Sequence, residues 1–362
     1  MKKVLFLTTA LIATGSMAAA DVRISGYGRF GLDYNEANDN RVTGTTLNPT
    51  FISGTFSSGT ATGNVLNETS ITSRLRLQFD MSAETDGGVT FGARFRAQAE
   101  SRDGTPGGAT FNGGRFFASY GGLTVGVGNI LGAVEAMQGL YLETRTAGAG
   151  IDGMGFTSIV ANMAGNAFDW DAYSSAGTGV NGVEVIYNAG NFGVHVSYSQ
   201  QNDIAVGSFT ATTGGSSIFS TAIVGGEENT AISAYYTFGD WTVALAYNDE
   251  SVSGGNNDLT IFTVQGDLGF AGVRLAYAEM DNTGAIGGDS SKIGLYGVFD
   301  IGAATTLVAF VTDEDSPGLA TDGTGYGLHL SHDLGGGVSF EAAWVEDSTD
   351  NTQVQAGVYF SF

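Results

Sequence analysis

The segment ITSRLRLQFDMSAETDGGVTFGARFRAQAE, residues 71–100, decides the fold class of this chain. In its first half the apolar residues Leu75, Leu77 and Phe79 occupy alternate positions, and polar or charged residues lie between them. The second half repeats the alternation after the Asp86–Gly88 turn, whose composition favours a tight hairpin. A period of two is typical of a strand with one buried face, so the segment predicts an antiparallel hairpin.

The same alternation continues over the rest of the chain, for example in residues 22–34 and 353–362. Seven short turns alternate with eight longer polar segments. The short turns lie near Asp86-Gly87-Gly88, Gly121-Gly122, Gly190-Asn191, Gly239-Asp240, Gly269-Phe270, Gly302-Ala303 and Gly335-Gly336. The longer segments are roughly 36–68, 102–113, 130–181, 202–229, 252–258, 281–290, 314–322 and 348–351. Together these connections predict sixteen strands.

An even number of strands, with short turns at one end and longer loops at the other, is typical of an outer-membrane barrel. Lipid offers no hydrogen bonds, so a sheet that crosses it must close on itself. Sixteen strands enclose an aqueous channel instead of a packed interior. The sequence therefore predicts an all-β fold, a 16-stranded antiparallel transmembrane β-barrel over residues 21–362. The alternative is a secreted β-rich surface protein or adhesin.

The N-terminal segment and the net charge indicate where the protein is located and which partners it can have. Residues 1–20, MKKVLFLTTALIATGSMAAA, have the pattern of a secretory signal peptide, in which Lys2 and Lys3 precede a short apolar run and a small-residue cleavage site. We expect cleavage before Asp21 and export to the bacterial outer membrane. The formal net charge of −23 argues against nucleic acid as a partner.

Five arginines lie on the polar faces of the first three predicted strands, each near the middle of its strand: Arg29, Arg74, Arg76, Arg94 and Arg96. Neighbouring strands bring such side chains together, so we expect one basic surface, called here the arginine wall. A charged side chain that faces lipid is costly. The arginine wall is therefore expected to line a water-filled lumen, as the basic side of a pore constriction.

The segment 130–181 is far too long for a hairpin connection, and a structureless stretch of this length usually has a function. We expect it to fold inward as the third loop and to narrow the pore. Its carboxylates Glu135, Glu143 and Asp152 are predicted to face the arginine wall as the acidic side of the constriction. Opposed charges of this kind tune pore selectivity. The alternative is local pairing of the arginines with loop acids.

The sequence contains no motif for a catalytic site, so no enzymatic activity is expected. A hydrolase would need a nucleophile beside a base and an orienting group. His195 and His329 are expected on lumen faces as solvated side chains, because the histidines lack the spacing of a zinc site. Asp169 and Asp171 could hold Ca²⁺ through their oxygens, with solvated loop acids as the alternative. No other cofactor is expected.

Several stretches resemble the trimeric general-diffusion porins of alphaproteobacteria, a family of Gram-negative outer-membrane porins. The stretches are residues 71–100, YGGLTVGVGNILGAVEAMQGLYLE (120–143), YTFGDWTVALAY (236–247), YGLHLSHDLGGGVSF (326–340) and the terminal VYFSF. The resemblance covers nearly all of residues 21–362, and segment 120–143 is its most specific part.

The resemblance implies a homotrimer in the outer membrane, in contact with lipid and lipopolysaccharide. It implies passive diffusion of small hydrophilic solutes and ions through an eyelet between an acidic third loop and a basic wall. It also implies that Phe362, the terminal aromatic residue, is an assembly signal. A substrate-selective channel of the same architecture is the alternative function.

Overall fold

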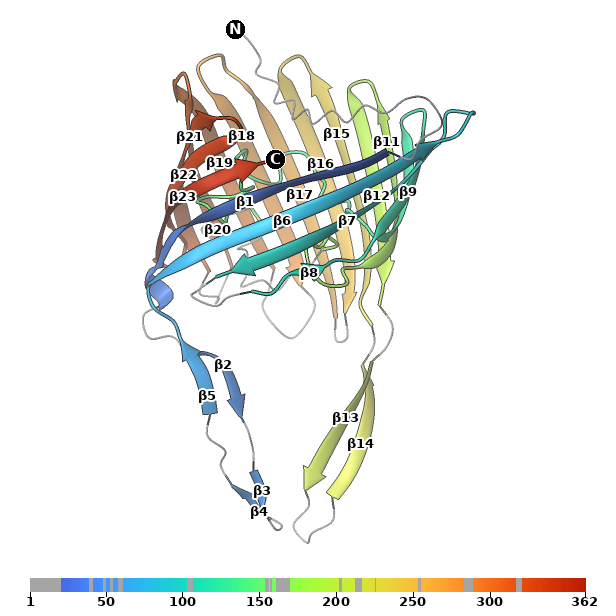
Figure 1. Cartoon of the computed structure of the whole chain (residues 1–362), viewed down its shortest axis with the longest axis vertical. Helices are drawn as coiled ribbons and strands as arrows, with labels where there is room; N and C mark the ends of the chain where they lie inside the picture. The colour runs from blue at the N-terminus through green and yellow to red at the C-terminus, as the bar shows by residue number, and fades with distance from the viewer. Residues whose placement is uncertain are drawn as a thin grey trace.

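Sixteen antiparallel strands of the described residues form one closed barrel (Figure 1). The computed structural model describes residues 21–38, 42–47, 50–52, 55–57, 61–102, 107–153, 156, 158–160, 170–201, 204–211, 217–224, 226–252, 255–282, 289–316 and 321–362. The barrel strands are β1 (Asp21–Asn35), β6 (Thr69–Glu84), β7 (Thr90–Ser101), β9 (Arg115–Tyr120), β10 (Leu123–Asn129), β11 (Asn181–Ala189), β12 (Phe192–Gln200), β15 (Glu228–Phe238), β16 (Trp241–Val252), β17 (Gly255–Asp267), β18 (Gly272–Asn282), β19 (Ser290–Gly302), β20 (Thr305–Asp315), β21 (Gly323–Gly335), β22 (Val338–Glu346) and β23 (Thr352–Ser361). The short β8 (Thr110–Phe111) adds to the edge of β7 beside β9.

The first strand closes the barrel, because β1 is paired along both of its edges. It pairs with β6 from Asp21 to Tyr34 and with β23 from Tyr27 to Asn35. The terminal residue continues this seam, since the Gly26 amide donates to the Phe362 carbonyl at 2.9 Å. A closed sheet leaves no open edge for lipid to face. The predicted 16-stranded barrel is confirmed.

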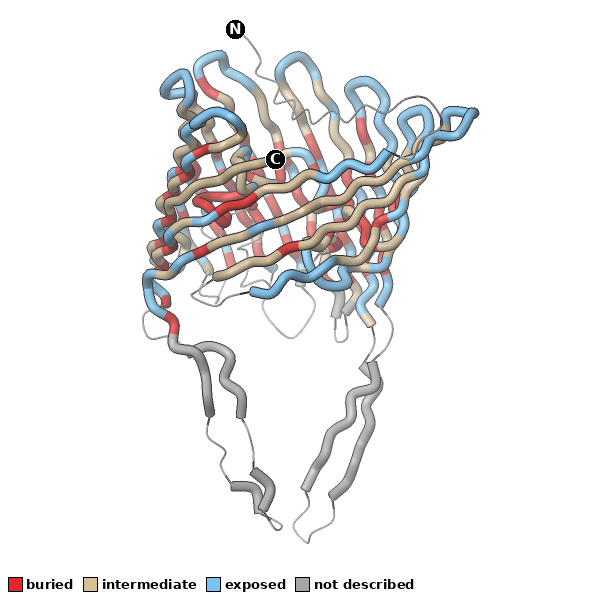
Figure 2. Tube along the Cα trace, in the orientation of Figure 1, coloured by how far each residue is buried: buried red, intermediate tan, exposed pale blue. Residues whose placement is uncertain are grey.

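The outer surface of the barrel is apolar, and the polar residues of the same strands point inward. On β1 the even-numbered residues Val22, Phe30 and Leu32 are exposed by 54–60%, whereas Arg29 and Asp33 are 2% exposed. Figure 2 shows the resulting mixture of exposed, intermediate and buried positions along the strands of the barrel. Since side chains alternate across a pleated strand, the period read from the sequence assigns each residue to its face.

Two of the long connections contain hairpins of their own, which the sequence reading had taken as loops. Within 36–68 lie β2 (Val42–Leu47) paired with β5 (Ala61–Val65), and β3 (Thr50–Ile52) paired with β4 (Thr55–Ser57). Within 202–229, β13 (Ile204–Ala211) pairs with β14 (Ser217–Val224). A single-turn helix, η1 (Glu36–Asn38), follows β1. Threonine, valine and isoleucine recur in these segments, and such residues favour strands.

In the part of the chain that the structure describes, no helix is long and apolar enough to span a bilayer.

Spin labels on β6 will separate the two faces of the barrel. The chain has no cysteine, so Leu75→Cys and Arg76→Cys each give one labelling site. Leu75 lies on the exposed apolar face and Arg76 on the inner face. We expect the label at 75 to be relaxed by lipid-dissolved oxygen and the label at 76 by a water-soluble paramagnet. Equal accessibility of the two labels to both reagents would contradict the assigned faces.

Candidate functional site

The third loop is residues 130–180 between β10 and β11, and those of its residues that the structure describes lie inside the barrel. The Ala133 amide donates to Ser197 Oγ on β12 at 2.9 Å, and Thr263 Oγ1 on β17 donates to the Gln138 carbonyl at 2.9 Å. These bonds attach the loop to the inner surface of two separated strands. The predicted inward fold of this loop is confirmed.

The loop continues around the inner surface to the seam of the barrel. The Gly150 amide donates to His329 Nδ1 on β21 at 3.0 Å. Thr72 Oγ1 on β6 donates to the Asp152 carboxylate, also at 3.0 Å. Gly150 has φ +81°, a backbone conformation that glycine adopts easily. The loop therefore touches strands on opposite sides of the lumen.

One side of the third loop is apolar, and it packs against an apolar half of the inner surface. Phe156 stacks on Phe310 of β20 with 4.4 Å between ring centroids. The loop contributes the buried residues Ala133, Val134, Met137, Leu140, Leu142, Ala149, Phe156, Ile159 and Val160. The strands from β15 to β22 contribute Ala231, Ala244, Ala246, Leu259, Ile261, Ala276, Ala278, Met280, Tyr296, Val308, Phe310, Ala343 and Val345. Small alanines on these strands leave room for the larger loop side chains.

The arginine wall lies on β1, β6 and β7, which cross the front of Figure 1. Arg29 is directly opposite Arg74 in the pairing of β1 with β6. Arg94 and Arg96 are opposite Asp80 and Gln78 in the pairing of β6 with β7. The five arginines named from the sequence thus lie on three adjacent strands with side chains on the inner face.

Two carboxylates within these strands partly neutralise the arginine wall. Glu100 on β7 accepts from Arg29 at 3.2 Å and Arg74 at 3.3 Å, and also from Arg102 at 2.7 Å. Asp80 on β6 pairs with Arg94. Neither acid was assigned from the sequence, although each has the same strand parity as the arginines beside it. Part of the arginine wall is therefore paired locally. The partners are carboxylates on its own strands, where the alternative interpretation expected carboxylates of the loop.

Asp152 is the predicted acidic residue that contacts a strand of the arginine wall, through Thr72 of β6. Glu135 instead accepts hydrogen bonds inside the third loop, from Tyr141 Oη and, at 3.0 Å, from Trp170 Nε1. Burial and the neighbouring Glu135 carboxylate raise the pKa of Tyr141, so its hydroxyl keeps the donated proton. The hydrogen bonds of Glu135 thus differ from the expected contact with the arginine wall.

Glu143 also differs from expectation, because its ion pair is with Arg274 on β18. Glu143 Oε1 lies 2.8 Å from Arg274 Nη2, and the Glu143 side chain is 58% exposed. Arg274 also donates to Gln265 Oε1 at 3.0 Å and to the Tyr141 carbonyl. The apolar packing of the loop against β15 to β22 places residue 143 on that side of the lumen.

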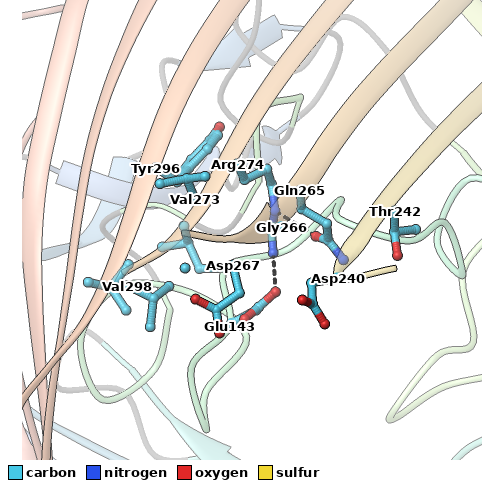
Figure 3. Close-up of a pocket in the computed structure, with 13 residues that line it drawn as sticks. Glu143, Asp240, Thr242, Gln265, Gly266, Asp267, Val273, Arg274, Tyr296 and Val298 are labelled. Carbon is cyan, nitrogen blue, oxygen red and sulfur yellow. Dashed lines mark hydrogen bonds and ion pairs between the residues drawn. The ribbon is translucent and has the colours of Figure 1, made fainter. Parts of the chain in front are cut away.

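Figure 3 shows the ion pair of Glu143 and Arg274 at a cavity of about 300 Å³ between the loop and β16 to β20. Asp240 and Asp267 lie beside it, and Tyr296 and Val298 provide apolar surface. Sequence reasoning did not assign Arg274 to the site. Arg274 lies far along the chain from the other arginines, and nothing in the sequence near it indicates that the third loop would contact it.

The two inward-facing histidines are buried in ion-pair networks, so the expectation that they are solvated was wrong. His195 Nε2 lies 3.0 Å from Glu184, which also binds Arg115. His329 Nε2 lies 2.9 Å from Glu341 and is 1% exposed. The third loop covers both sites, which local alternation could not reveal. Through the amides of Gly150 and Leu131, these networks help to hold the loop against β21 and β11.

The predicted Ca²⁺ site has little support among the described residues. Asp171 accepts a hydrogen bond from Ser199 Oγ at 2.8 Å, and Asp169 lies outside the described residues. Within the described ranges, no group of three or more acidic, histidine or cysteine side chains could hold a metal ion.

Phe362, the predicted assembly signal, is 53% exposed at the end of the seam with β1.

Comparisons with known proteins agree with this architecture. A family model described as Gram-negative porin matches residues 7–352. A porin of Fuscovulum blasticum is 28% identical over 342 residues, covering 94% of this chain and 100% of the relative. A porin of Rhodobacter capsulatus is 27% identical over 317 residues, covering 80% and 93%. Among solved structures, a mutant of the Rh. blastica porin aligns with a TM-score of 0.68 at 26% identity, covering 94% of this chain and all of that one.

Proposed function

Because the chain belongs to the Gram-negative porin family, whose members are general-diffusion channels of the outer membrane, we propose that solutes cross it between the arginine wall and the third loop. In this proposal the channel passes small hydrophilic solutes and ions without catalysis. The constriction is the passage beside the basic wall on β1, β6 and β7, which the third loop narrows from the side of β15 to β22 and touches at Tyr173 and Ser175.

The observation that carries the proposal is the one-sided apolar packing of the third loop. Its apolar residues are buried against β15 to β22, whereas four arginines of the wall keep partial contact with solvent: Arg74, Arg76, Arg94 and Arg96. The side chains of Arg74 and Arg94 are 17% and 31% exposed. A polar passage beside these side chains is therefore open to water, while the third loop occupies much of the opposite half of the lumen.

Charge across this passage would act on solutes during transit. The arginine wall bears more positive charge than Glu100 and Asp80 neutralise, and the loop presents Glu143 and Asp152. Fixed charges of opposite sign in a narrow pore orient dipolar solutes and exclude apolar ones. The preference between cations and anions depends on whether a passing ion lies closer to the arginine wall or to the loop carboxylates.

Assembly and export complete the proposal. A cleaved signal peptide over residues 1–20, which lie outside the described residues, would leave Asp21 as the first residue of β1. The family typically forms trimers, and the apolar outer face of β1 suits either a subunit contact or lipid. Phe362 would serve as the assembly signal at the closing seam. Lipopolysaccharide of the outer leaflet would contact the outer surface of the barrel.

Planar-bilayer recording tests the channel directly. Detergent-purified protein is expected to insert as discrete, ohmic conductance steps in potassium chloride. A tenfold salt gradient across the bilayer then gives a reversal potential, which reports the preference between potassium and chloride. Uptake into liposomes should rise linearly with solute concentration for a general-diffusion channel. If the correctly folded barrel gave no conductance steps, this result would contradict the proposed function.

A further inference from the structure

We propose that Arg76, Arg96 and Ser175 form a binding subsite for a doubly charged oxyanion, such as inorganic phosphate or a phosphate monoester. The inference rests on the proposed function, because the subsite lines the proposed passage. It adds a class of solute that the channel would hold briefly during transit.

Two guanidinium groups from neighbouring strands converge on one hydroxyl oxygen of the third loop. Arg76 Nη1 on β6 donates to Ser175 Oγ at 2.7 Å, and Arg96 Nη1 on β7 donates to the same oxygen at 3.4 Å. An oxygen between two guanidinium groups occupies the position that an anion would take. Since Ser175 Oγ accepts both bonds, its own proton is directed elsewhere and can bind a further acceptor.

These two arginines differ from the rest of the arginine wall in their partners. Arg29 and Arg74 share Glu100, and Arg94 has Asp80. Within the described part of the chain, neither Arg76 nor Arg96 forms an ion pair with a carboxylate. Their acceptors are neutral groups: Ser175 for both, and Gln78 Oε1 for Arg96 at 2.9 Å. Two adjacent positive charges therefore lack negative partners, and a bound dianion would supply both.

Aromatic rings hold the two guanidinium groups in place. The Arg76 guanidinium lies 4.5 Å from the ring centroid of Tyr27, and that of Arg96 lies 4.6 Å from the centroid of Tyr173. Tyr27 is itself stacked on Tyr359 at 5.2 Å. Donors that are fixed before binding lose less entropy when a ligand arrives. Both arginines are only half-buried, so a solute in the lumen can reach them.

The donor geometry selects the chemical class. Guanidinium groups are planar and present parallel N–H donors that match the oxygens of phosphate. A tetrahedral dianion can accept from both groups and from the serine hydroxyl, and its charge balances the two unpaired cations. Chloride matches the charge of one arginine and, as a monatomic ion, has no separate oxygens with which to accept from both guanidinium groups. Phosphate, phosphate monoesters and sulfate share the required chemistry.

The test is calorimetric titration of inorganic phosphate into detergent-solubilised protein, together with phosphate inhibition of chloride current in bilayers at constant ionic strength. We expect saturable binding and saturable inhibition in the native protein. Arg76→Gln and Arg96→Gln should each weaken both by about tenfold, the loss of a charge-assisted hydrogen bond. Arg76→Lys should also weaken binding, because lysine keeps the charge but lacks the planar pair of donors. Sulfate and a phosphate monoester, titrated in parallel, show which of these oxyanions binds most tightly.

Arg23→Gln is the matched control, since Arg23 has the same strand parity as Arg29 on β1, is opposite Asp80 in the pairing with β6, and lies outside the subsite. Phosphate affinity in this variant should stay within about twofold of the native value, and a loss equal to that of Arg76→Gln would overturn the subsite in favour of general charge attraction. Normal conductance without saturable phosphate binding would overturn the subsite and leave the channel function intact. If no conductance is seen, the proposed function fails, and the calorimetric titration still decides whether the subsite exists.

Discussion

Replacing Arg74, Arg76, Arg94 and Arg96 together with glutamine is expected to shift the channel strongly toward cations. The arginine wall and Arg102 hold an excess of positive charge over Glu100 and Asp80, and the four substitutions remove that excess. Asp80 also loses its partner Arg94. A unit charge about 4 Å from a passing ion in water is worth about 1 kcal/mol, a factor of about five in local concentration. The permeability ratio of potassium to chloride should therefore rise by at least about fivefold.

The reversal potential in a tenfold potassium chloride gradient measures this shift. Arg23→Gln is again the appropriate control, since it lies on the same face and should change the ratio far less. Barrel folding in each variant can be checked by heat-modifiable mobility in detergent gels. An unchanged reversal potential and unchanged conductance in the folded quadruple variant would remove the arginine wall from the constriction.

Phe156→Ala is expected to loosen the third loop without opening the barrel. The ring of Phe156 stacks on Phe310 at 4.4 Å and lies 6.1 Å from that of Tyr296, and the residue is 4% exposed. Truncation of a buried phenylalanine costs about 3–5 kcal/mol, a large share of what docks a single loop. The sixteen-stranded hydrogen-bonded wall does not depend on this contact. Larger single-channel conductance and frequent current fluctuations should follow, because the loop would leave its position more often.

Single-channel recording and solute exclusion in liposomes measure the effect, and Phe91→Ala provides the control. Phe91 lies on β7 with 54% exposure on the outer surface, so its truncation removes a ring of equal size without touching the loop. Heat-modifiable mobility should be the same for both variants. Steady native conductance in Phe156→Ala would show that the apolar contacts of the loop do not hold the constriction.

Residues 71–100 show how much of the barrel could be read from the chain. The alternation of Leu75 and Phe79 with Arg74 and Arg76 assigned both faces, and the Asp86–Gly88 turn placed the hairpin. The pleat of a strand and the contrast between lipid and water act on each residue locally, so a local pattern records them. The hairpins within 36–68 and 202–229 were missed, because short threonine-rich stretches do not show whether two segments pair.

The partners of the constriction residues depended on contacts between distant segments. Glu143 and Arg274 are separated by 131 positions, and Gly150 and His329 by 179. No pattern near either residue of a pair indicates the other. The contacts follow from the fit of the loop's apolar side against the inner surface of β15 to β22, where alanines leave room for it.

The sequence by itself determined the sixteen strands of the barrel, their inward and outward faces, the strands that carry the arginine wall and the inward course of the third loop. Each of these follows from alternation, turn composition or segment length. Only the tertiary structure decided that Glu100 and Asp80 neutralise part of the wall, and that Glu143 binds Arg274. The physical reason is that ion pairing acts over a few ångströms, and the distances between side chains on different strands are set by barrel closure and loop packing.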